Sequence, residues 1–128
     1  MEDKPPRQCV IPLHKPSQRE LIFFFLSGIL VSIPNALFFS NFYQFFPGAV
    51  AVILLAPFVE EFAKVLPLFY RHGESERSIV TLGALIGLGF GVSEFFLYVV
   101  IYDVPWYVRI PGVIFHASSA SVTAYGVA

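Results

Sequence analysis

Four apolar stretches alternate with short polar segments along most of the chain, after a polar first 20 residues that contain four prolines. A helix of about 20 apolar residues crosses the hydrocarbon core of a bilayer. The pattern therefore predicts an all-α, polytopic membrane protein, a bundle of about four transmembrane helices. The predicted organisation is a cytoplasmic tail over residues 1–20 and a transmembrane core over residues 21–128, with spans at about 21–39, 48–70, 79–102 and 110–128.

Composition supports the membrane class. Hydrophobic residues make up 56% of the chain and charged residues 13%, whereas soluble domains average about 45–50% and about 25%. The net charge of −1 gives no reason to expect a nucleic-acid partner, so the expected surroundings are the lipid bilayer. The single cysteine, Cys9, excludes a disulfide within the chain and a CxxC metal site.

Lysine and arginine predict the orientation in the membrane. The N-terminal tail carries four of them, and the loop between the second and third spans adds Arg71 and Arg77, whereas the opposite side has only Arg109. Cytoplasmic loops carry an excess of basic residues. We therefore expect a multi-pass protein of the cell membrane with both termini in the cytoplasm. The chain stops on an apolar stretch, which leaves open whether further spans follow residue 128.

Ionisable residues inside the predicted spans are the candidate functional groups. Glu60 and Glu61 are adjacent in the second span with Lys64 one turn later, Glu94 lies in the third span, and His116 lies in the fourth. Such residues are costly in a membrane and mark functional sites by default. At a rise of about 1.5 Å per residue, Glu60, Glu94 and His116 lie roughly 18, 12 and 9 Å from the outer ends of their spans. All three fall in the outer half of the bilayer, so we expect one shared site.

Small residues predict which face of the third span packs against its neighbours. Gly83, Gly87 and Gly91 recur every four residues, and Glu94 follows Gly87 by seven. A stripe of small residues lets neighbouring helices approach closely. Glu94 is therefore expected near the packed face of this helix rather than the lipid face.

The second and fourth spans show matching polar spacings. His116, Ser119 and Thr123 stand at i, i+3 and i+7, which places them on one stripe. Glu60 and Lys64 stand at i and i+4, the favourable order for an ion pair on a helix. A purely structural ion pair between Glu60 and Lys64 would explain one carboxylate and leave the other unpaired. We therefore favour a functional role for the acidic pair.

Three segments resemble the motifs of the PrsW-type intramembrane protease family. EEFAK (60–64) is similar to the EExxK motif, GFGVSEFFLY (89–98) to the second motif, and RIPGVIFHASSASVTAYG (109–126) to the third. The family commonly has Asn where this chain has Phe95, and Thr or Ser where it has Ala120. The resemblance extends to a wider superfamily that includes the CAAX-prenyl endopeptidases and a non-catalytic subunit of gamma-secretase.

The resemblance implies an intramembrane endopeptidase that depends on glutamate, is of metallo-type, and cleaves membrane-anchored peptide or protein substrates. The candidate catalytic residues are Glu60, Glu61, Glu94 and His116, with Glu60 or Glu61 as the base. A second set would support these groups: Lys64, Tyr98 and Ser119.

One histidine and two carboxylates suit zinc with an open water position, and the proposed ligands are Glu61, Glu94 and His116. The resemblance also permits a metal-independent glutamate mechanism, so the cofactor stays open.

Two other functions remain as alternatives. A non-catalytic membrane scaffold or sensor would use the same polar residues to hold its helices together. A cation or proton pathway would also place acidic and histidine side chains in the membrane. A pathway needs polar groups through the inner half of the bilayer too, and segments 65–70 and 79–87 are nearly apolar, which disfavours it.

Overall fold

A computed structural model of the chain describes residues 15–42, 45, 48–71 and 75–127, and within these ranges it holds helices and no strand. The predicted all-α class is confirmed for this part of the chain, whereas Cys9 and the other residues of segment 1–14 lie outside it. The α-helices are α1 (Gln18–Phe42), α2 (Gly48–Val50), α3 (Ala56–Val65), α4 (Glu76–Phe96) and α5 (Trp106–Tyr125). Three shorter segments are the π-helical η1 (Ala51–Leu55), the 3-10 helical η2 (Leu66–Arg71) and the π-helical η3 (Leu97–Ile101).

Prolines account for the irregular winding between Gly48 and Arg71. A proline inside a helix lacks the amide hydrogen that would bond to the fourth residue before it. The π-helical η1 ends two residues before Pro57, and the 3-10 helical η2 contains Pro67. Both departures are the usual response of a helix to a missing backbone bond. The ordinary α-helical turns between them, α3, carry Glu60, Glu61 and Lys64.

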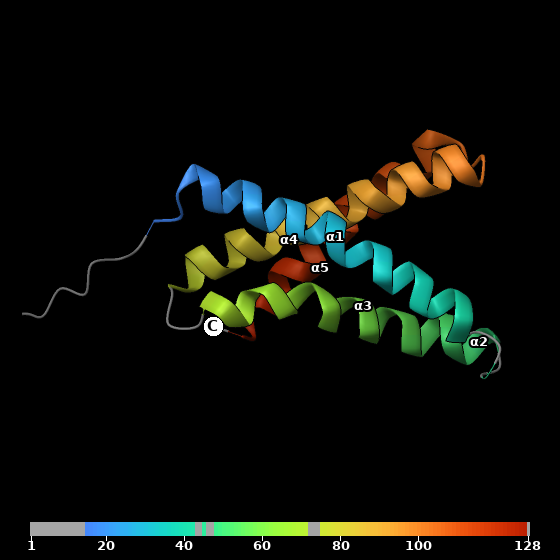
Figure 1. Cartoon of the computed structure of the whole chain (residues 1–128), viewed down its shortest axis with the longest axis horizontal. Helices are drawn as coiled ribbons and strands as arrows, with labels where there is room; N and C mark the ends of the chain where they lie inside the picture. Colours follow the sequence, from blue (N-terminus) through green and yellow to red (C-terminus); the bar gives the residue numbers. More distant parts are fainter. Residues whose placement is uncertain (1–14, 43–44, 46–47, 72–74, 128) are drawn as a thin grey trace, which may run out of the picture.

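Helix α4 occupies the centre and packs against α1 and α5. Figure 1 shows α1 crossing α4 and then running beside α3 toward α2. Glycines permit the crossing, because a Cβ atom added at Gly28 would collide with the backbone of Ile86, and one at Gly89 with the backbone of Phe25. The two helices therefore meet backbone to backbone at this point.

The glycine stripe of α4 faces α5, as the spacing of small residues predicts. A Cβ atom at Gly83 would collide with Ala124, and one at Gly87 would collide with the carbonyl group of His116. One at Gly91 would press on the backbone of Val113. The His116 backbone therefore lies directly against α4. Its imidazole lies next to Glu94 of α4.

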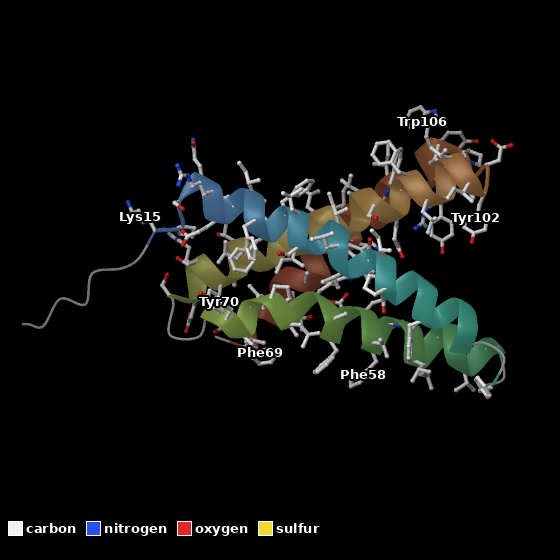
Figure 2. The ribbon with its side chains drawn as sticks, viewed as in Figure 1. Lys15, Phe58, Phe69, Tyr70, Tyr102 and Trp106 are labelled. Atoms are coloured by element: carbon white, nitrogen blue, oxygen red, sulfur yellow. The ribbon has the colours of Figure 1, made fainter. Side chains whose placement is uncertain are left out.

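Large apolar side chains cover much of the outside. Phe58 is 72% exposed and Phe69 50% exposed, and both point away from the other helices in Figure 2. The same figure places the aromatic residues Tyr102 and Trp106 at the end of the molecule opposite Lys15. Within the described residues, one helical stretch, Glu76–Ile101, is long and apolar enough to cross a membrane. The other three spans stay predictions.

Candidate active site

Three side chains from three helices meet where α3, α4 and α5 face one another. Glu60 of α3, Glu94 of α4 and His116 of α5 each offer one ligand atom, and these atoms all lie within 4.8 Å of one another. The histidine is buried and the two glutamates are half-buried. We call these three residues the Glu–Glu–His cluster. It contains one residue from each of the three spans in which the sequence places ionisable groups.

The imidazole of His116 is held at both nitrogens. Lys64 Nζ lies 2.8 Å from Nδ1, and Glu94 Oε2 lies 2.8 Å from Nε2. A lysine ammonium group has donors only, so with Lys64 charged Nδ1 accepts and Nε2 carries the proton that is donated to Glu94. The ring of Phe90 packs against the imidazole with the centroids 5.0 Å apart. These contacts leave His116 one orientation, with Nε2 toward the two glutamates.

Glu61 lies in a different set of contacts from Glu60, its neighbour in sequence. Its Oε1 accepts hydrogen bonds from Lys64 Nζ at 2.7 Å and from Ser119 Oγ at 2.8 Å, and its Oε2 accepts one from Thr123 Oγ1 at 3.2 Å. The polar stripe of α5 thus binds the second acidic residue of α3. Glu61 thereby joins α3 to α5 and holds the Lys64 ammonium group against His116.

The Glu60 carboxylate has no such partners. Among the side chains that the structure describes it forms no hydrogen bond or ion pair, although the spacing of four residues favours Lys64 as its partner. Lys64 pairs instead with Glu61, three residues away, because its ammonium group is also drawn to His116 on α5. Both oxygens of Glu60 are therefore available for a water molecule, an ion or a substrate.

Arg109 holds the carboxylate of Glu94, the cluster residue on α4. Its guanidinium group donates a hydrogen bond to Glu94 Oε2 at 3.2 Å and stacks on the ring of Tyr98, 4.0 Å from the centroid. Tyr98 therefore helps to orient Arg109, which binds the Glu94 carboxylate. In the sequence, Arg109 is the one basic residue of the predicted outer side and the first residue of the third motif, and neither observation gives it a role at the site. Its spacing of seven residues from His116, two helical turns on the same face, is the signal that could have placed it at the site.

A comparison with protein families identifies the chain. A model of the PrsW family of intramembrane metalloproteases matches residues 16–128. The chain belongs to the PrsW family. It is therefore a member of a family of membrane-integral metalloproteases, as the three motifs suggest. No curated protein and no solved structure matches it.

A metal ion is implied by membership of the PrsW family, and the side chains in the structure fit one. Zinc accepts imidazole nitrogen and carboxylate oxygen and, in catalytic sites, takes three protein ligands. The Glu–Glu–His cluster supplies that set within 4.8 Å, with a buried imidazole. The carboxylates in it are those of Glu60 and Glu94, whereas Glu61, the sequence-based candidate ligand, lies with Lys64, Ser119 and Thr123.

Proposed function

We propose that this chain hydrolyses peptide bonds of membrane-anchored substrates at the Glu–Glu–His cluster. The observation that carries the proposal is the meeting of Glu60, Glu94 and His116 from three separate helices within 4.8 Å. Burying two carboxylates and an imidazole inside a largely apolar helical bundle is costly, and helix packing alone needs no such arrangement. Membership of the PrsW family supports the same conclusion independently.

We assign Glu60 as the group that takes the proton from the attacking water. Its carboxylate has no competing bond among the described residues, so it can bind the water and align it. The water oxygen then forms a bond to the carbonyl carbon, and the bond between that carbon and the amide nitrogen breaks. The proton taken by Glu60 passes to the leaving nitrogen. The second proton of the water also ends on that nitrogen, so the products are one new carboxylate end and one new ammonium end.

His116 would stabilise the oxygen that becomes negative during the attack. Its Nε2 proton, which is donated to Glu94 in this structure, would be shared with that oxygen when no metal is bound. A donor aimed at developing negative charge is among the strongest contributions to catalysis. Glu94 orients that nitrogen and is itself held by Arg109. Glu61 and Lys64 are positioning residues in this account, because they act through His116 and through the contact between α3 and α5.

Glu60, Glu94 and His116 would be the residues that hold a zinc ion. A bound zinc ion would make its water more acidic and polarise the substrate carbonyl group. Each carboxylate has two oxygens, so Glu60 can offer one to an ion and keep the other for the proton of the water. To bind the ion, Nε2 of His116 would have to release its proton, so the negative oxygen would then be stabilised by the zinc ion and not by the imidazole N–H. The role assigned to Glu60 is the same in both cases.

Substrates are proposed to be membrane-anchored peptides that reach the cluster from within the bilayer or from its outer side. The distribution of basic residues predicts that both termini lie in the cytoplasm, and the four predicted spans would make the protein multi-pass in the cell membrane. A wider kinship with CAAX-prenyl endopeptidases rests on the sequence motifs alone.

The proposed function can be tested with the purified full-length chain in lipid vesicles. A set of membrane-anchored peptides is incubated with the wild type and with His116→Ala, and the products are sized by mass spectrometry. We expect cleavage by the wild type only, and elemental analysis should find about one zinc per chain, lost in His116→Ala and retained in Ser118→Ala. Wild-type chain that folds but cleaves no peptide would favour the scaffold or sensor instead.

A further inference from the structure

An open groove separates α1 from the end of α4 beyond their crossing point. Its volume is about 450 Å³, within the ~300–1,000 Å³ typical of ligand-binding sites. Ser32 and Ile33 of α1 line one wall, and the other is lined by Ser93 and Glu94 of α4 and by Leu97 and Val100 of η3, which continues α4. We call this space the α1–α4 groove. In Figure 1 the end of α4 and the second half of α1 diverge from their crossing, and the groove lies on that side.

The groove has one polar end and is otherwise apolar. The hydroxyl groups of Ser32 and Ser93 are hydrogen-bonded at 2.6 Å across the two helices. Glu94 lies next to Ser93 and lines the same end, whereas the walls beyond are formed by Ile33, Leu97 and Val100. An apolar ligand would therefore be held along most of its length and meet polar groups at one end only.

Glu94 connects the groove to the proposed site of cleavage. Its Oε2 accepts hydrogen bonds from His116 and Arg109, while its other oxygen, Oε1, forms none within the described residues. The same carboxylate that belongs to the Glu–Glu–His cluster thus forms part of the groove wall. The backbone of a peptide segment bound in the groove would therefore reach the Glu–Glu–His cluster at the polar end.

An extended peptide fits these features better than a lipid acyl chain or an intact helix. An acyl chain has no polar group for the hydroxyl and carboxylate end. A helix satisfies its own backbone groups and would leave the polar end unused. An unwound peptide has amide and carbonyl groups that Ser32, Ser93 and Glu94 can bind at that end, while its side chains pack on the apolar walls. The wall between Ser93 and Val100 is roughly 10 Å long. A fully extended peptide of about three residues has the same length.

We propose that the α1–α4 groove binds an unwound, apolar stretch of about three substrate residues on one side of the cleaved bond. It selects a bulky apolar side chain there, packed against Leu97 and Val100. This inference rests on the proposed peptidase function and adds the substrate preference and the residues that set it. Ser32 and Ser93 would bind the substrate backbone, and Glu94 would mark the point where the groove ends and cleavage occurs.

The first test narrows the groove. Val100→Phe is compared with Val108→Phe, the same change at another exposed valine on α5 outside the groove; the two valines are 74% and 54% exposed. Peptides carry Leu or Ala at each of three positions on either side of the cleaved bond. The wild type and Val108→Phe should prefer Leu at one of these positions by roughly 10-fold or more in kcat/KM. Val100→Phe should lose or reverse that preference. An unchanged preference in Val100→Phe would overturn the proposal.

The second test does not require cleavage and separates failure of the groove from failure of the peptidase. Val100→Cys and Val108→Cys are made with Cys9→Ser and Glu60→Gln, and each is mixed with a membrane-anchored peptide bearing one cysteine, with dissolved oxygen as the oxidant of the two thiols. Disulfide formation with Val100→Cys but not Val108→Cys supports the groove, even if the wild type proves unable to cleave. Equal or absent cross-linking at both positions overturns the groove, even if the wild type cleaves, and would leave lipid as its occupant.

Discussion

Lys64 Nζ lies 2.8 Å from Nδ1 of His116, although 52 residues separate the two in sequence. The lysine is 1% exposed, and its ammonium group also lies 4.6 Å above the ring of Phe90. A buried cation is stable only where its partners replace water, and here Glu61, His116 and an aromatic face do so. The contact between Lys64 and His116 thus links the EEFAK segment of α3 to α5 and holds the imidazole in place.

Replacing this lysine should destabilise the bundle. Lys64→Met keeps an unbranched side chain but removes the charge, which leaves the Glu61 carboxylate and His116 Nδ1 without their common partner. Breaking a buried pair in this way costs about 3 kcal/mol. The free energy of unfolding, measured by denaturing detergent in mixed micelles, should fall by that order in Lys64→Met and stay unchanged in Lys15→Met, which changes an exposed lysine. Equal stability of the two variants would contradict the assigned role of Lys64.

The two adjacent glutamates should respond differently to the same change. Glu60→Gln removes no hydrogen bond that the described residues form, so the protein should keep its stability while cleavage falls about 100-fold or more, the range of general base catalysis. Glu61→Gln loses an ion pair and should lower the free energy of unfolding as well. Cleavage rate and unfolding are measured on the same preparations. Full cleavage by folded Glu60→Gln would remove Glu60 from the role of base.

Close packing of α4 on α5 should be essential to the site. Gly87→Ala places a methyl group against the carbonyl group of His116, and overpacking of this kind costs typically ~1–3 kcal/mol. The helices would have to separate, which draws His116 away from Glu94. Gly48→Ala is the matched control, because nothing lies within 4 Å of a Cβ atom there. We expect reduced stability and cleavage for Gly87→Ala alone, and equal behaviour of the two would argue against the packing account.

Much of this arrangement could be predicted from local spacing. The four-residue repeat of glycines identifies the face of α4 that meets α5, and the positions of His116, Ser119 and Thr123 identify the stripe that faces α3. Both patterns depend only on helical periodicity. The shared depth of Glu60, Glu94 and His116 then suggests that they meet.

The division of roles between Glu60 and Glu61 could not be predicted in the same way. The two side chains diverge by about 100° around a helix, so the choice depends on how α3 is rotated. The π-helical η1 before Pro57 alters the winding, and no local pattern gives its extent. The partner of Lys64 depends likewise on His116, which lies on a distant helix. The hydrogen bond between Ser32 and Ser93 follows from the crossing of α1 and α4 and has no local signal.

The orientation in the membrane can be tested by labelling single cysteines in intact cells. In a Cys9→Ser background, Ser75→Cys precedes α4 on the predicted cytoplasmic side, and Gln44→Cys lies in the predicted outer loop. An impermeant thiol reagent should label Gln44→Cys directly and Ser75→Cys only after the cells are permeabilised. Labelling of Ser75→Cys from outside intact cells would reverse the predicted topology.

The most direct test of the central claim is a double-mutant comparison of Glu60 and His116. If both act on one water and one substrate bond, removing either should disable the site almost completely, because residues that act as a unit are not additive. The values of kcat/KM for a membrane-anchored peptide are measured for the wild type, Glu60→Gln, His116→Ala and the double variant, with folding checked in each. We predict that kcat/KM falls about 100-fold or more in each single variant. In the double variant it should fall no further than in the less active of the two single variants. Losses that multiply, or a folded single variant with wild-type kcat/KM, would contradict a common reaction centre.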